Sequence, residues 1–198
     1  MNPIYRMYHD LRQFQIALRK GATSFRDSLR PEGTVEATLF YADGPKKGNV
    51  YRTIKGKNIV TTTPLSGTAP SGGRDMMRRL LLQQGTSDSL QNVVYVANMV
   101  LGTNTAAETA SDQWSTLTEV TGSVVSISTV TLDSSNPYVT FTANWGQNEA
   151  NATNIAEAGL LSNRTGSGGA YDMFARKTFS PFTKTTDFTL QINWTLRF

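Results

Sequence analysis

The sequence predicts a mainly β protein: an antiparallel β-sandwich or jelly-roll-like domain with one short internal helix and an N-terminal amphipathic helical arm. Most of the chain after residue 33 alternates apolar and polar residues with the period of two that strands require. Clusters of Gly, Pro, Asn and Ser separate the alternating segments, as turns do. The first 30 residues instead repeat with a helical period. We therefore expect an arm over residues 1–33 and a β-sandwich over residues 34–198.

The predicted arm carries one apolar seam and all of the net charge. The seam residues are spaced three and four apart, as in a heptad repeat, and are Ile4, Met7, Leu11, Phe14 and Leu18, continued after Gly21 by Ala22, Phe25 and Leu29. Six basic and two acidic residues lie within residues 1–30, which equals the whole net charge of +4. Such a helix either packs on its own domain or docks on a neighbouring subunit. The segregated charge favours docking, with Arg12 and Arg19 beside the seam.

A β-hairpin is expected next, over residues 34–41 and 50–54, with a turn rich in Gly, Lys and Asn between them. Residues 55–58 are expected to form a further turn, with Ile59 and Val60 leading on. A short helix with an apolar and a basic face is expected at residues 74–84. The apolar run Val93 to Leu101 has the length of a strand that is buried on both faces. Residues 124–132 are expected to form one strand, with a β-bulge near Thr129 where the alternation changes face.

The C-terminal third contains the most regular alternation. Strands are expected at residues 139–145, 155–161 and 173–179. The last strand places six large side chains on one face: Phe188, Leu190, Ile192, Trp194, Leu196 and Phe198. That much apolar surface predicts a strand that closes the core of the domain.

Side chains suited to catalysis are almost absent. The chain has no cysteine and its only histidine is His9, so disulfides, thiolate chemistry and Ser-His-Asp or Cys-His sites are not expected. Glu108, Asp112 and Glu119 lie in or beside a polar connection, but their spacing matches no calcium loop, and we expect a solvated loop. No apolar run approaches the roughly 20 residues of a membrane span. The sequence thus predicts no enzyme, no metal, no cofactor and no membrane partner.

Two segments and the last strand carry a resemblance to a known family. Residues 154–161 read NIAEAGLL, residues 172–184 read DMFARKTFSPFTK, and the alternating C-terminal strand follows. This order resembles a group of tailed-bacteriophage virion proteins in which an EAGL strand, an M-ARxxF-P-K segment and a last strand of LxIxWxLxF type close a β-sandwich. Weaker similarity extends over residues 34–198. Members are described variously as tail, fibre or head-associated structural proteins, so the resemblance implies a virion component without catalytic residues.

The function expected from the sequence is a non-enzymatic structural component of a phage particle, assembled in the host cytoplasm. The arm would attach the domain to capsid, neck or tail subunits, within a symmetric homo-oligomer. The alternative is a host-recognition module in which Trp114 or Tyr171 stacks on a cell-surface glycan. Nucleic acid binding through the basic arm is the least favoured, because the charge of the arm is modest and its apolar seam is strong.

Overall fold

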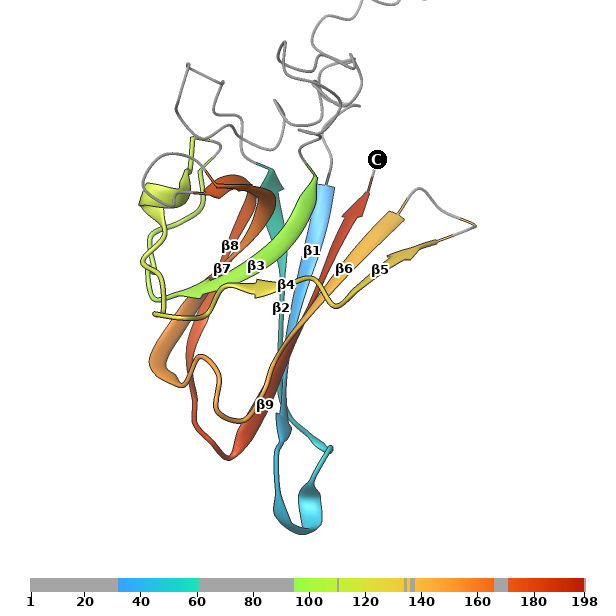
Figure 1. Cartoon of the computed structure of the whole chain (residues 1–198), viewed down its shortest axis with the longest axis vertical. Helices are drawn as coiled ribbons and strands as arrows, with labels where there is room; N and C mark the ends of the chain where they lie inside the picture. The colour runs from blue at the N-terminus through green and yellow to red at the C-terminus, as the bar shows by residue number, and fades with distance from the viewer. Residues whose placement is uncertain are drawn as a thin grey trace, which may run out of the picture. The chain divides into compact units, whose positions relative to one another are not determined.

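The computed structural model describes residues 32–60, 95–165 (without 110, 134, 136 and 137) and 171–197, and these residues form β-strands almost throughout (Figure 1). The mainly β class is therefore confirmed. The strands are β1 (Glu32–Tyr41), β2 (Val50–Val60), β3 (Val96–Gly102), β4 (Val125–Ser126), β5 (Thr129–Leu132), β6 (Tyr138–Trp145), β7 (Ala152–Thr165), β8 (Tyr171–Lys184) and β9 (Phe188–Arg197). Two 3-10 turns, η1 (Gly44–Lys46) and η3 (Trp114–Thr116), lie in the connections. The predicted arm helix and the predicted helix at 74–84 lie outside the described residues.

The strands form two antiparallel sheets that share β2. The strand order is β4-β3-β7-β8-β2-β1-β9-β6-β5. Most of β2 pairs with β1, but its last residues, Ile59 and Val60, pair with β8, so β2 passes from one sheet into the other. In Figure 1, β1, β9, β6 and β5 fan out on the right and β3, β7 and β8 form the layer on the left. β1 begins at Glu32, two residues before the start expected from the sequence. The turn predicted at residues 55–58 is wrong, because β2 continues through these residues and pairs them with β1.

The core lies between the two sheets and has the C-terminal strand near its centre. Register places Trp194 of β9 beside Val35 of β1 and Phe141 of β6, so all three side chains point to the same face. Trp194 is fully buried and the other two nearly so, and residues of β3, β7 and β8 meet them from the opposite sheet. The predicted alternation of the last strand is therefore confirmed for residues 188–197.

The prediction of one bulged strand over residues 124–132 is wrong. Ile127 donates its backbone N–H to the carbonyl of Ala97 of β3, at 2.8 Å, whereas the next residue, Ser128, donates to that of Thr142 of β6, also at 2.8 Å. β4 therefore belongs to one sheet and β5 to the other. The change of face in the sequence pattern marks the point where the chain crosses between sheets.

Two expectations for the second sheet are met in part. β3 is buried on both faces from Met99 to Gly102, as its unbroken apolar run predicted, although its first residues are only half-buried. β7 and β8 each span 14 residues and are longer than the segments expected from the sequence. Their pairing contains several register shifts, which interrupt the alternation that the sequence pattern depends on.

Candidate functional site

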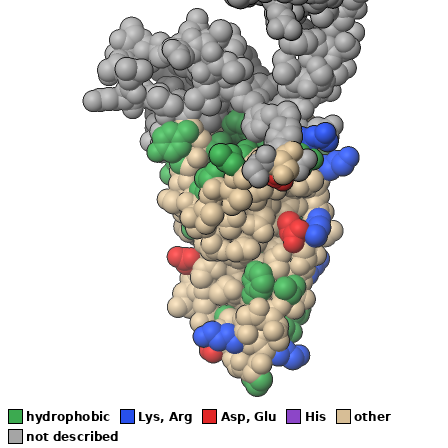
Figure 2. All heavy atoms as spheres, turned by 90° about the vertical axis from the view of Figure 1, so that its right-hand side faces the viewer, with side chains coloured by type: hydrophobic (Ala, Val, Ile, Leu, Met, Phe, Trp, Pro, Cys, Tyr) green, Lys and Arg blue, Asp and Glu red, His purple; other side chains and the backbone are tan. Residues whose placement is uncertain are grey.

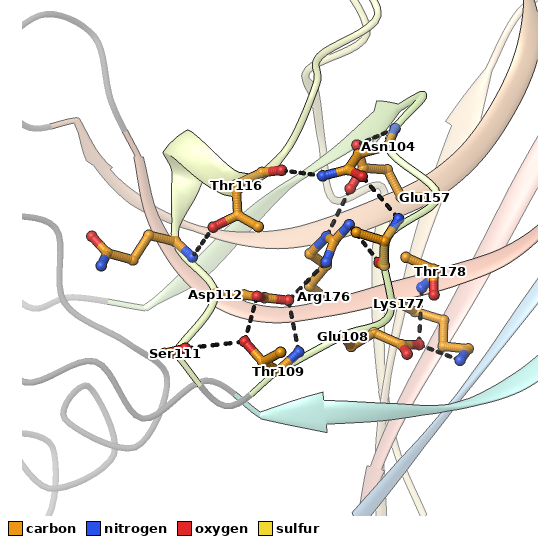
Figure 3. Close-up of polar contacts among 12 residues, drawn as sticks. Asn104, Glu108, Thr109, Ser111, Asp112, Thr116, Glu157, Arg176, Lys177 and Thr178 are labelled. Atoms are coloured by element: carbon orange, nitrogen blue, oxygen red, sulfur yellow. Dashed lines mark hydrogen bonds and ion pairs between the residues drawn. The ribbon is translucent and has the colours of Figure 1, made fainter.

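A polar network among the described residues fixes the connection between β3 and β4 onto β7 and β8 (Figure 3). Arg176 of β8 donates from Nε to Glu157 Oε2 of β7 at 2.7 Å, and from Nη1 to Asp112 Oδ2 of the connection at 2.8 Å. It also donates to the backbone oxygen of Ala106 at 3.2 Å. The three charged side chains are at most 4% exposed. Each buried charge thus has an opposite charge in contact, which offsets the loss of hydration.

The second oxygen of Glu157 receives backbone N–H groups from the same connection. Oε1 accepts from Asn104 and from Thr118, both at 2.9 Å. The side chain of Asn104 in turn donates to the carbonyl of Thr116 at 2.7 Å. A β-carbon on Gly102 would overlap this carboxylate and lie 2.7 Å from the backbone oxygen of Thr118. Glycine at this position therefore gives the carboxylate its room.

The prediction of a solvated loop is wrong for two of the three carboxylates, Asp112 and Glu108, which are buried or nearly so and form ion pairs. Asp112 accepts from the hydroxyl of Thr109 at 2.7 Å and from its backbone N–H at 3.0 Å, in addition to Arg176. Glu108 pairs with Lys177 and accepts the backbone N–H of Thr178 at 3.0 Å. Glu119 is exposed, as expected. The cations that bind these carboxylates come from β8, far away in the sequence, so local spacing could not reveal them.

The pairing changes the acidity of the carboxyl groups. Burial by itself would raise the pKa of Asp112, but hydrogen bonds from Thr109 and Arg176 outweigh burial and lower this pKa. Burial likewise opposes ionisation of Glu108, and the bonds from Lys177 and Thr178 lower its pKa. For Arg176, burial disfavours the charge, but Asp112 and Glu157 raise the pKa of the guanidinium. All of these shifts favour the ionised form of the network.

A second buried cation lies at the far end of β8. Lys184 is 1% exposed, and its Nζ donates to the carbonyls of Gly146 and Glu149 and to Asn151 Oδ1, each at 2.8 Å. Burial lowers the pKa of Lys184, and the charge of Glu149 opposes that shift. The ammonium group thus holds the turn between β6 and β7 closed.

Both buried cations bind the loops to the sheets. The carboxylates that accept from Arg176 also accept backbone N–H groups of the connection, whereas Lys184 donates to backbone carbonyls of the turn. Within the described ranges, no group of three or more His, Cys, Asp or Glu side chains is placed to hold a metal ion. The same part of the chain has no helix that is both long and apolar enough to cross a bilayer.

The two residues predicted to stack on a glycan lie together. The ring centroids of Trp114, in η3, and Tyr171, at the start of β8, are 5.2 Å apart and the ring planes are inclined by 53°. Both rings are half-buried and pack on a small cluster made by Val100, Leu117, Leu161 and Met173. Part of each ring therefore serves the fold, and the remainder faces outward. The predicted attachment residues of the arm, Ile4 to Leu29 with Arg12 and Arg19, lie outside the described residues.

Sequence reasoning missed an aromatic cluster beside the β1–β2 hairpin. Tyr51 stacks on Phe188 with 4.5 Å between centroids and 24° between planes, and Tyr41 contacts both rings. Tyr51 remains 52% exposed. A depression of about 240 Å³ adjoins it, and Arg52 and Asp187 are among the polar residues that line it. The only sequence signal was a tyrosine on each side of the hairpin turn.

Comparison of the chain with protein-family models, with curated proteins and with solved structures finds no match.

Proposed function

We propose that this chain is a non-enzymatic structural component of a tailed-phage particle, attached to capsid, neck or tail subunits through its N-terminal arm. One observation supports this role most directly. Three of the five charged residues in the two segments that resemble phage virion proteins, namely Glu157, Arg176 and Lys184, are buried groups that hold the loops on the sheets. The motif therefore serves the scaffold, and a rigid scaffold is what a particle component needs.

The packing around Gly159 supports the same interpretation. Gly159 belongs to the EAGL segment, and a β-carbon there would lie 3.0 Å from side-chain atoms of Leu117 and Val100. A larger residue would push the connection between β3 and β4 away from β7. The EAGL segment thus combines a carboxylate that holds this connection with a glycine that lets it pack closely.

The test is whether the protein is part of purified particles. Antibodies raised against residues 32–197 should label tailed particles, purified by density gradient, from lysates of the host that carries the gene. The chain should also copurify at a fixed ratio to the major capsid protein, as a symmetric component does. A chain that stays in the particle-free fraction of the lysate would refute the structural role.

Glycan binding is the second candidate, and the aromatic rings favour it. A sugar ring stacks on an exposed aromatic face, and neighbouring polar groups then fix its hydroxyls. Tyr51, with Arg52 and Asp187 nearby, offers such a face beside the depression, and the outward parts of Trp114 and Tyr171 offer another. Binding to a panel of bacterial surface polysaccharides, with loss in Tyr51→Ala or in Trp114→Ala, would favour this candidate and identify the ring. Binding unchanged in both variants, or absent, would exclude it.

A further inference from the structure

The sheet of β2, β1, β9, β6 and β5 has two edges that differ in charge. The part of β2 that does not pair with β8 carries three exposed cations, Arg52, Lys55 and Lys57. Lysine and arginine on an edge strand oppose pairing with another chain. β5, at one end of the strand order, carries no charge over Thr129–Leu132. Among the described residues no strand pairs with its outer side, so β5 is an open edge without the protection that β2 has.

The backbone groups of β5 that face outward can be assigned from its pairing with β6. Asp133 donates its N–H to the carbonyl of Tyr138 at 3.1 Å, which makes these two residues a hydrogen-bonded pair. The register then makes Thr131 and Thr129 the residues that bond β6, because bonding alternates along an antiparallel strand. The N–H and C=O groups of Val130 and Leu132 therefore point away from the sheet.

The same two residues carry apolar side chains that the described part of the fold leaves uncovered. Val130 lies opposite Phe141 and Leu132 opposite Val139, so both lie on the face of the sheet that forms the core. Phe141 and Val139 are 9% exposed, whereas Val130 is 53% and Leu132 76% exposed. Figure 2 looks toward this side of the molecule, where hydrophobic groups gather in the upper part and charged groups lie mainly toward the margins. The core surface thus continues onto β5 and ends unpaired.

We propose that β5 pairs with β5 of a second copy of this chain, antiparallel and about a two-fold axis at Thr131. In this register Val130 of each copy bonds Leu132 of the other, through the backbone groups that face outward. Val130 then meets Leu132 of the partner copy on the core face, and the two Thr131 side chains meet on the opposite face. Apolar matches apolar and hydroxyl matches hydroxyl, so the strand is complementary to itself.

The proposed contact between two β5 strands is small, so it should be weak between free chains. A strand of four residues buries far less than the roughly 1,200 Å² of a typical stable interface, so free chains should associate weakly. Where copies are held close together, the effective concentration strengthens such a contact. The pairing of β5 does not depend on the proposed virion role, because the self-complementary edge would act in any assembly.

A single introduced cysteine tests the register in the full chain, which has none of its own. The two Thr131 residues would form a non-hydrogen-bonded pair with their Cα atoms about 4.5 Å apart, within the range for a disulfide. Thr131→Cys should therefore form a disulfide-linked dimer under mild oxidation. Thr53→Cys, on the exposed and positively charged edge of β2, is the control and should form far less of this dimer. Equal cross-linking of the two variants would overturn the proposal.

Sedimentation velocity over a wide concentration series tests the edge itself. The unmodified chain should show a concentration-dependent dimer, and Leu132→Lys should abolish it. Val50→Lys is the matched control, because Val50 is also exposed, at 56%, but lies on β2. A monomer at all concentrations, with a Thr131→Cys thiol that is protected from reagents, would mean that another segment of the same chain covers β5, and would refute the pairing. Loss of the dimer in both lysine variants would refute it as well.

Discussion

Glu157, Arg176 and Asp112 show how a buried charge network selects one arrangement of a long connection. Removing such charges from water costs free energy, and the attraction between the buried charges offsets about that amount, so the net stabilisation is small. Their contribution is therefore specificity, because only one placement of the connection brings Asp112 and the N–H groups of Asn104 and Thr118 to their partners. A displaced connection would leave buried charges unpaired, which is the more severe penalty.

Replacing Arg176 by methionine should therefore be severe. The variant keeps the apolar length of the side chain but leaves Glu157 and Asp112 buried without a cation, and the expected loss is about 3–5 kcal/mol of unfolding free energy. Lys55→Met is the control, since Lys55 pairs with Glu36 on the surface at 70% side-chain exposure. That pair should contribute no more than about 1 kcal/mol. Urea unfolding measures both, and equal losses would show that the network does not hold the fold.

The lowered pKa values of Asp112 and Glu108 predict loss of stability in acid. Their ordinary values are 3.8 and 4.5, and in the folded chain both are lower. The stability that these carboxylates contribute is thus fully present above the ordinary values and is lost as the pH falls through the folded ones. Urea midpoints measured from about pH 6 to pH 3 should fall, and Asp112→Asn should flatten the fall. An equally steep fall in that variant would assign the acid sensitivity to other groups.

At the level of elements, β9 is the central strand that joins β1 to β6 and β5 in one sheet. It pairs with β1 on one side and with β6 on the other over nearly its whole length. Its inner side chains are buried, whereas its outer ones form hydrogen bonds across the strands, such as Thr195 with Thr140 at 2.9 Å. One face of β9 therefore provides hydrophobic burial and the other a polar surface.

Adjacent residues of β9 should respond very differently to truncation. Trp194→Ala removes a fully buried side chain from the centre of the core and should cost about 3–5 kcal/mol. Asn193→Ala removes a half-buried side chain that accepts one hydrogen bond from Thr142 at 2.8 Å, and should cost about 1 kcal/mol. Thermal unfolding compares the two variants, and identical melting temperatures would contradict the assignment of faces.

Strands that show alternation between neighbouring residues could be predicted from the sequence, whereas contacts between segments far apart in the sequence could not. β1, β6 and β9 follow from alternation, because the strand period is a property of neighbouring residues. The crossing at Ile127 and Ser128 changes the face of the sequence pattern, and a bulge within one strand changes it in the same way, so the pattern alone does not distinguish the two. The partner of Asp112 is 64 residues away, so only the folded sheets bring Arg176 to it. The aromatic pair was named residue by residue, but its contact depends on packing.

For the whole molecule, the described residues supply one folded unit, Glu32–Arg197, with an open edge at β5. Residues 1–30, the predicted arm, carry the net positive charge, and residues 31–198 have equal numbers of acidic and basic side chains. A long-range electrostatic attraction to a negatively charged neighbour would therefore act through the arm. The β5 edge, which is uncharged, would act only at contact distance and join copies that are already in place.

The predicted attachment through the arm can be separated from folding. Deleting residues 1–30 should leave a soluble folded domain that no longer joins the particle, because every described strand lies outside the deletion.

Leu11→Asp combined with Leu18→Asp should have the same effect, since unpaired charge in a docked apolar seam is costly. Gln13→Asp, on the side of the predicted helix away from the seam, is the control and should assemble normally. Arg12→Gln with Arg19→Gln should weaken assembly more mildly and mainly at low salt. Copurification with particles and circular dichroism measure assembly and folding, and a truncated chain that aggregates would place the helix in the core of its own domain.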